Sequence, residues 1–338
     1  MSQIITVIAG DGIGPEITEA TLRALQALDC DLDYEFADAG MTALDQSGEL
    51  LPEKTLDSIR RNGIALKGPL TTPIGKGFKS VNVSLRTLFD LYANVRPVIS
   101  MPGTRARYED VDIITVRENT EGAYLAADAM VSEDGSRAES KMVITRKGSE
   151  RVTRYAFELA RREGRRKVTL VHKANILKAV SGLFLDVARE VAGEYPDIIC
   201  EEMIVDATCM KLVMDPHQFD VIVTTNLFGD IISDLCAGLI GGLGLAPGAN
   251  IGKTAAMFEA VHGSAPDIAG KQVANPCALM LAAAMMLAHL GQMDKAALLR
   301  NSIIGTMASG DRVTPDLGGT GKTSEFADAI IERIHASG

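Results

Sequence analysis

The stretch VIAGDGIGPEI, residues 7–17, joins an apolar run to a helix-like acidic stretch through three glycines and a proline. A dinucleotide-binding turn has glycines at its first, third and sixth positions. Gly10 and Gly12 match the first two, but Gly14 falls one residue early and Pro15 stands in the sixth position. These residues alone leave two interpretations open. One is a phosphate-binding loop, and the other is a strand-to-helix turn with Pro15 in the first helical turn.

Beyond this turn, strand-like runs alternate with stretches of helical period. The runs are ITVIAG, VDIITVRE, KVTLVHK, DIICEEMIV and FDVIVTT, and helices are expected over residues 15–28, 276–290, 293–309 and 324–335. This alternation predicts an α/β fold with a largely parallel sheet. Residues 122–146 are an exception, because two strand-like runs flank Asp134-Gly135 and predict a hairpin that projects from the body.

Composition limits the class of protein. A length of 338 residues predicts two domains. The net charge of −10 argues against a nucleic-acid partner, which needs a basic face. No run approaches the roughly 18 apolar residues of a membrane span, so no membrane partner is expected. The first residues, MSQIITVIAG, lead directly into a strand, and a cytoplasmic location is expected. The five cysteines form no CxxC pair, which argues against disulfides and zinc.

Two stretches raise the possibility of nucleotide triphosphate hydrolysis. Residues 252–254 and 321–323 both read Gly-Lys-Thr, the end of a phosphate-cradling loop. Each lacks the first glycine of that motif, since Pro247 and Asp316 stand there. The sequence therefore disfavours this class.

Asp230 and Asp234 lie four residues apart in NLFGDIISD and project from one face of a predicted helix. Like charges at this spacing repel unless a cation lies beside them. The pair is either a solvated polar face or part of a site for Mg²⁺ or Mn²⁺, which prefer carboxylate oxygens.

The sequence also contains three arginines, Arg86, Arg96 and Arg117, whose charge is opposite to that of this acidic pair. Singly each could be a surface or salt-bridged residue, but together they could clamp a polycarboxylate through paired hydrogen bonds. Ser80 and Asn82 precede Arg86 and could add neutral hydrogen bonds, although Ser80 alone would be interpreted as a helix cap.

Motifs along essentially the whole chain resemble those of the β-decarboxylating dehydrogenases, the isocitrate/isopropylmalate dehydrogenase family. They are GDGIGPEI, KGPLTTPIG, SVNVSLR, DLYANVRP, RENTEGAY, HKANI, NLFGDIISD, GANIG, FEAVHGSAPDIAG and DLGGTGKTSEF. The resemblance implies a two-domain α/β fold that is not a Rossmann fold. Residues 1–95 and 242–338 would form a large cofactor-side domain. Residues 96–241 would form a small domain with the dimer interface and a clasp hairpin near 122–146.

The resemblance also assigns roles to single residues. It implies that the three arginines hold the substrate carboxylates and that Tyr124 and Lys173 are the acid and base. Asp206, Asp230 and Asp234 would bind Mg²⁺ or Mn²⁺. Lys173 and Asp206 resemble residues that this family takes from the neighbouring protomer, so a homodimer with shared active sites is expected.

Substrate and cofactor follow from two further motifs. Ser80 and Asn82 look like the isocitrate pattern, with homoisocitrate and 3-isopropylmalate as alternatives. The rival from another functional class is a noncatalytic regulatory subunit. Asp267 and Ile268 stand where NADP-dependent relatives place lysine and tyrosine, which favours NAD, unless Asp267 only caps a short helix. The other residues expected near the cofactor are Ile13, Thr72, Glu259, His262, Gly263, Ala265 and Asn275. The opening turn would then form one wall of the cleft.

Overall fold

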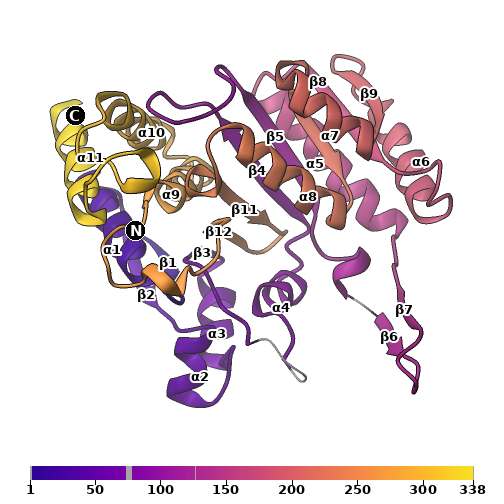
Figure 1. Ribbon diagram of the computed structural model, residues 1–338, viewed down its shortest axis with the longest axis horizontal. Helices are drawn as coiled ribbons and strands as arrows, with labels where there is room; N and C mark the ends of the chain where they lie inside the picture. The colour runs from indigo at the N-terminus through magenta and orange to yellow at the C-terminus, as the bar shows by residue number, and fades with distance from the viewer. Residues whose placement is uncertain (1, 74–77, 126, 338) are drawn as a thin grey trace.

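The computed structural model describes residues 2–73, 78–125 and 127–337, and Figure 1 shows a large sheet through the middle of the molecule with helices on both faces. The sheet has the order β2-β1-β3-β12-β11-β4-β5-β10-β8-β9. Its strands are β1 (Gln3–Ile8), β2 (Leu32–Phe36), β3 (Ile64–Lys67), β4 (Ala93–Ile99), β5 (Asp112–Glu118), β8 (Lys167–His172), β9 (Ile199–Ile204), β10 (Val221–Thr224), β11 (Pro247–Ile251) and β12 (Ala256–Ala260).

The two flanks of the sheet are parallel, as the alternating pattern predicts, but its centre is not. The pairings β12–β11, β11–β4 and β4–β5 are antiparallel. One half of the strand order comes from residues 3–67 and 247–260, and the other half comes from residues 93–224. The halves meet where β11 pairs with β4. The division into two domains stays a prediction.

The helices cover the sheet. They are α1 (Gly14–Ala27), α2 (Met41–Ser47), α3 (Glu53–Asn62), α4 (Val81–Leu88), α5 (Arg146–Arg162), α6 (Val180–Ala192), α7 (Val205–Met214), α8 (Asn226–Leu239), α9 (Cys277–His289), α10 (Met293–Ser309) and α11 (Thr323–Ser337). Helix α9 packs against β11 and β12 on one side and against α10 and α1 on the other. It is apolar on nearly all sides because it is enclosed. No helix in the described ranges is long and apolar enough to cross a membrane.

The opening glycine turn is closed by contacts within the protein. The amide N–H groups of Asp11 and Ile13 donate to the carbonyls of Pro69 and Ser264, both at 2.8 Å. The Asp11 carboxylate accepts from the Thr42 amide at 2.9 Å, at the start of α2. Two of the amide donors that a phosphate could use are therefore already occupied, which favours the strand-to-helix turn over the phosphate loop.

Residues 122–146 contain an antiparallel hairpin, with β6 (Ala127–Val131) paired to β7 (Ala138–Lys141). Gly135 lies in the turn with a φ of +69°. The hairpin extends away from the body (Figure 1), and residue 126 lies outside the described residues. Its role as a clasp stays a prediction.

Candidate active site

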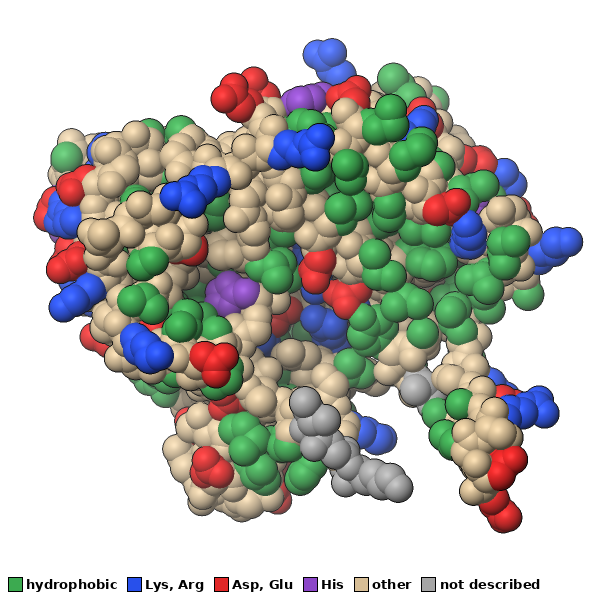
Figure 2. All heavy atoms as spheres, in the orientation of Figure 1, with side chains coloured by type: hydrophobic (Ala, Val, Ile, Leu, Met, Phe, Trp, Pro, Cys, Tyr) green, Lys and Arg blue, Asp and Glu red, His purple; other side chains and the backbone are tan. Residues whose placement is uncertain are grey.

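The centre of the site is an ion-pair cluster formed by β4, β5 and α8. Arg96 Nη1 lies 3.2 Å from Asp230 Oδ1 and 3.3 Å from Asp234 Oδ1. Arg117 also forms an ion pair with Asp230, and both of its remaining nitrogen atoms donate to Asn226 Oδ1. The structure therefore brings together two of the predicted substrate arginines and both predicted metal ligands of α8. Figure 2 shows acidic and basic side chains side by side in a hollow on this face.

The two carboxylates of α8 differ in their electrostatic environment. Burial alone would raise the pKa of Asp230, but Arg117, the Tyr124 hydroxyl and Arg96 outweigh it and hold the pKa below its usual value. Burial raises the pKa of Asp234, and the nearby Asp230 charge adds to this effect, against the influence of Arg96. Among the described residues, Asp230 is paired with both arginines and Asp234 with Arg96 alone.

Tyr124 joins the cluster from the 3-10 helix η1 (Gly122–Leu125). Its hydroxyl donates to Asp230 Oδ2, and the Arg117 guanidinium carbon lies 4.9 Å from the centre of its ring. Burial and the Asp230 carboxylate raise the pKa of Tyr124, so the hydroxyl keeps its proton at neutral pH.

A second buried ion group lies on β3 and β12. Lys67 Nζ is 2.7 Å from Glu259 Oε2, and Arg86 approaches Glu259 Oε1 at 3.5 Å. Burial would raise the pKa of Glu259, but Lys67 and Arg86 hold it well below its usual range. Glu259, expected near the cofactor, is thus a charged anchor that also positions the third predicted substrate arginine.

Buried asparagines connect the two ion groups. Asn250 donates to Glu259 Oε1 at 2.7 Å and accepts from Asn94 Nδ2 at 2.6 Å. Asn94 in turn accepts from Arg96 Nε at 2.7 Å. Because β11 and β4 are adjacent, one continuous chain of hydrogen bonds crosses the junction between the two halves of the sheet.

Helix α4 carries the other predicted substrate residues. Ser80 is its N-cap, and the Ser80 hydroxyl accepts a hydrogen bond from the Val83 amide at 3.4 Å. In this structure Ser80 is therefore a helix cap. The amide oxygen of Asn82 is buried and has no hydrogen-bond partner among the residues that the structure describes. Thr72 accepts from the Val81 amide at 3.1 Å and thereby supports the start of α4. The unpartnered Asn82 oxygen is the free polar atom of this group.

Lys173 and Asp206 do not join this cluster. They pair with each other, from the end of β8 and the first turn of α7. The Lys173 hydrogen bond lowers the pKa of Asp206. Across the described residues, no ion pair links them to Asp230 or Asp234, and no group of three potential metal ligands forms.

The predicted cofactor residues lie mainly in the segment after β12. His262 Nδ1 lies 2.9 Å from the Gly263 carbonyl, and its buried Nε2 has no partner within residues 2–73, 78–125 and 127–337. Burial lowers the pKa of His262, so the ring is neutral and Nε2 can accept a hydrogen bond. The amide of Asn275 already donates to Asp316 at 3.0 Å, and its carbonyl accepts from the Cys277 amide at 2.9 Å.

Asp267 lies in the 3-10 helix η4 (Pro266–Ile268) and is exposed. This helix has no side-chain cap, which disfavours the interpretation of Asp267 as a cap. A Cβ added at Gly263 would meet no atom within 4 Å in the described structure. Ala265 has a left-handed backbone with a φ of +40°, and the Ile268 side chain is half-buried. The side chain of Ile13 is only 5% exposed and packs in the core. The opening turn therefore contacts this segment mainly through the Ile13 amide, which donates to the Ser264 carbonyl.

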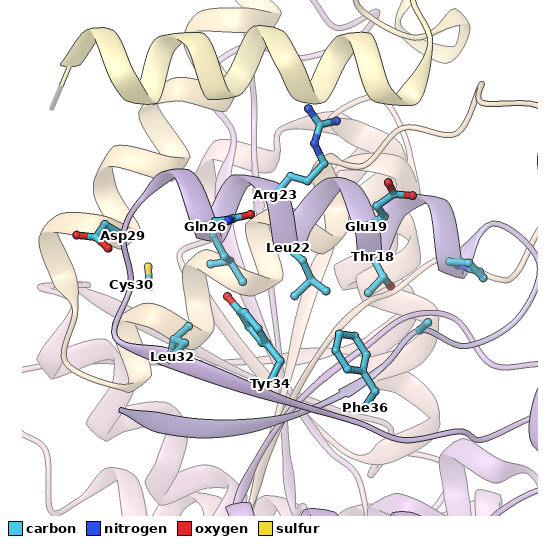
Figure 3. Close-up of a pocket in the computed structure, with 13 residues that line it drawn as sticks. Thr18, Glu19, Leu22, Arg23, Gln26, Asp29, Cys30, Leu32, Tyr34 and Phe36 are labelled. Carbon is cyan, nitrogen blue, oxygen red and sulfur yellow. The ribbon is translucent and has the colours of Figure 1, made fainter. Parts of the chain in front are cut away.

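A separate groove between α1 and β2 contains none of the predicted site residues. Its cavity volume is about 660 Å³, and Tyr34 and Phe36 of β2 face Leu22 of α1 in it (Figure 3). It lies at the edge of the sheet, away from β4, β5 and α8. The groove is not part of the candidate active site.

The sequence alone assigns no role to several residues of this network. Lys67, Asn94, Asn226, Ser233 and Asn250 all contact predicted site residues. A signal is present in the sequence for one of them, because Asn94 is a polar residue inside a strand-forming run, where an unpaired amide would be costly.

Known proteins resemble this chain over nearly its whole length. A family model described as isocitrate/isopropylmalate dehydrogenase matches residues 4–330. The solved structure of isocitrate dehydrogenase from Methylococcus capsulatus has a TM-score of 0.96 and 55% identity, and covers 99% of each chain. A regulatory subunit of the mitochondrial NAD isocitrate dehydrogenase of Dictyostelium discoideum is 47% identical over 99% of this chain and 93% of its own length. The 3-isopropylmalate dehydrogenase of Archaeoglobus fulgidus is 50% identical over 98% and 99%, respectively. The similar proteins are thus named for two different substrates.

Proposed function

We propose, because the chain belongs to the isocitrate/isopropylmalate dehydrogenase family, that it oxidises and decarboxylates isocitrate to 2-oxoglutarate and CO2 with NAD. The observation that carries this proposal is the cluster of ion pairs and hydrogen bonds that joins Arg96, Arg117, Tyr124, Asp230 and Asp234. It combines cations for carboxylates, a protonated phenol and two acidic side chains, and an oxidative decarboxylation of a hydroxy acid uses all three.

Substrate recognition would rest on Arg86, Arg96 and Arg117. Buried guanidinium groups bind carboxylates strongly because water does not compete for their donors. The extra carboxylate of isocitrate needs polar partners where an isopropyl group needs apolar ones. Asn82 supports isocitrate, because its free polar atom would be left unpaired by an apolar analogue. Homoisocitrate and 3-isopropylmalate remain the alternatives, and a relative named for the latter is 50% identical.

Asp230 and Asp234 are suited to a divalent cation. Both carboxylates lie on one face of α8, and Arg96 Nη1 approaches each of them. Asp206 of a second copy of the chain would complete the ligand set. When bound, Mg²⁺ or Mn²⁺ would supply Lewis-acid stabilisation of negative charge on the substrate.

The proton transfers fall to Lys173 and Tyr124. Lys173 would accept the proton of the substrate hydroxyl as the hydride leaves for NAD. Tyr124 keeps its proton at neutral pH, because burial and Asp230 raise its pKa, and it would donate that proton to the carbon from which CO2 departs. General acid-base catalysis of this kind contributes roughly 10² to 10⁴ in rate.

A homodimer would bring Lys173 to the cluster. Helices α7 and α8 expose apolar side chains, including Met210, Met214 and Ile231, which are 55%, 71% and 53% exposed. Hydrophobic side chains gather over these helices beside the hollow (Figure 2). A two-fold interface through this face would bury them and exchange α7 residues between the two sites. The projecting hairpin β6–β7 would clasp the second copy.

Asp267 supports NAD as the cofactor. Its exposed carboxylate would accept hydrogen bonds from ribose hydroxyls and repel a 2′-phosphate. His262 Nε2, which has no partner within the described part of the chain, would offer a further acceptor from the same segment. The cytoplasm stays the expected location, although several relatives are named as mitochondrial.

The test is a panel of purified-protein assays that follows NADH or NADPH absorbance. Isocitrate, homoisocitrate and 3-isopropylmalate are each supplied with NAD or NADP, with and without Mg²⁺ or Mn²⁺. The expected result is a metal-dependent rate with isocitrate and NAD. No turnover with any substrate would favour the regulatory rival, and faster turnover of 3-isopropylmalate would overturn the proposed substrate.

One variant sharpens this panel. Asn82→Leu should lower kcat/KM for isocitrate by roughly tenfold or more and raise that for 3-isopropylmalate, because a buried polar atom is replaced by an apolar one. Thr87→Leu, at an exposed position of the same helix, is the matched control and should leave the ratio unchanged.

A further inference from the structure

The strands that carry the active-site cluster have a second, apolar face. Along β4, Arg96 points into the cluster while its neighbours Val95 and Pro97 point to the opposite side of the sheet. On β11, Asn250 belongs to the network and Ala249 faces away from it. The rear of these strands is therefore available for contacts unrelated to catalysis.

A cavity of about 640 Å³ lies on that rear face, between α5 and α9. Its volume falls within the roughly 300 to 1,000 Å³ typical of small-molecule sites. The floor is apolar, and it is formed by residues of both halves of the sheet: Val95, Pro97, Ile99, Ala249, Ile251 and Phe258.

The rim of the cavity carries more positive than negative charge that is not neutralised by an ion pair. Arg165 is neutralised by Asp112 and Asp220. By contrast, Arg162 at the end of α5 and Arg300 of α10 have no carboxylate within 4 Å in the part of the chain that the structure describes. The rim also carries the acidic Glu163. The two unneutralised arginines outnumber it, in a chain whose net charge is −10.

His289 connects the rim to the floor. Its ring centre lies 5.5 Å from that of Phe258, and burial together with the Arg162 charge lowers its pKa. The histidine is therefore neutral at physiological pH and adds a polar but uncharged edge. Cations on two helices thus face an apolar floor across one cavity.

We propose that this cavity is a binding site for a small amphipathic anion, with an aliphatic or aromatic body on the floor and one carboxylate-like head between Arg162 and Arg300. The groove between α1 and β2 (Figure 3) lacks this charge pattern, because its Arg23 is paired with Asp328. The inference concerns binding alone and does not rest on the proposed reaction.

The test is isothermal titration of the full-length protein with octanoate, and with octanol as the uncharged probe. Octanoate should bind saturably at one site per chain, and octanol should bind at least about tenfold more weakly. Saturating isocitrate and NAD should not displace octanoate. Displacement would overturn the proposal, as would the absence of saturable binding or equal affinity for the two probes.

Variants locate the site. Arg162→Gln combined with Arg300→Gln should weaken octanoate binding by at least about tenfold. Arg166→Gln, which removes an exposed arginine that does not line the cavity, should change it by less than about twofold. Ala288→Leu should weaken binding of octanoate by filling the cavity while the thermal midpoint shows that the protein is folded. Equal affinity in the double variant and the Arg166→Gln control would contradict the assignment.

Discussion

At the scale of the residue, Asp267 determines the preference for NAD over NADP in our proposal. Its side chain can be replaced with little effect on the packing of the protein. It is exposed, and its neighbour Ile268 is half-buried. Asp267→Lys with Ile268→Tyr should move the ratio of kcat/KM values toward NADP by roughly tenfold or more, because a repulsive charge is replaced by an attractive one. Asp267→Asn should only reduce the discrimination. An unchanged ratio in steady-state assays would mean that Asp267 does not contact the ribose.

Asn250 is the residue on which both ion groups depend. Its amide has partners on Glu259, Asn94 and Asn119, all buried. Asn250→Leu should lower the free energy of unfolding by about 2 to 4 kcal/mol, because several buried polar groups lose a partner. Asn301→Leu, on the exposed face of α10, should change it by less than about 0.5 kcal/mol. Urea denaturation measures both, and equal effects would contradict the assigned role.

The sequence identifies the charged members of the site better than the neutral ones. The charges of Arg96, Arg117 and Asp230 indicate their chemistry in the sequence, the family resemblance adds Tyr124, and the structure brings the four together. Asn250 has no role until β11 is placed beside β4, because the meaning of an amide depends on which groups surround it. Such neighbours are set by strand order, which local pattern does not encode.

At the scale of the element, the opening turn shows why its glycines are spaced as they are. A Cβ on Gly12 would lie 2.0 Å from the Ser264 carbonyl oxygen, and its φ is +59°. Gly48 has a similar φ of +80° but open space around it. The spacing therefore reflects close contact with a loop distant in sequence, which no inspection of residues 7–17 alone could show.

These two glycines make a matched pair of variants. Gly48→Ala should lower the free energy of unfolding by about 1 kcal/mol, the cost of a left-handed backbone for alanine. Gly12→Ala should cost about 3 kcal/mol or more, because it adds a clash with backbone. It should also raise KM for NAD by displacing the segment from His262 to Asp267. Equal losses in thermal and chemical denaturation would show that the contact with Ser264 is not tight.

Strand prediction succeeds and fails for a physical reason. The long apolar runs are observed as β5, β8, β9 and β10. The small residues 236–252 instead suggest only close backbone packing, yet β11 forms within them. Its residues are favourable for a strand only because α9 and the neighbouring strands enclose them. Burial by distant segments overrides weak local preference there.

At the scale of the whole molecule, the pairing of Lys173 with Asp206 is the feature that one chain leaves unexplained. Both residues belong to the proposed chemistry, but they lie apart from the cluster of Arg96, Asp230 and Tyr124. A two-fold dimer resolves this, because each site takes its cluster from one chain and its Lys173–Asp206 pair from the other. Light scattering should give a dimer, and Ile231→Lys should shift it toward monomer with loss of activity.

Mixing of variant chains tests the sharing of sites directly. Lys173→Ala and Arg86→Ala proteins should each be nearly inactive, whereas a mixture denatured and refolded together should recover about a quarter of the wild-type activity. Half of its dimers are then heterodimers, and each heterodimer has one intact site. Lys173→Ala mixed with Asp206→Asn is the control, because every heterodimer site then lacks one of the two residues. No recovery in the first mixture would place Lys173 and Arg86 in one chain's site. Recovery in the control would mean that Lys173 and Asp206 reach one site from different chains, and either result would contradict the proposed exchange.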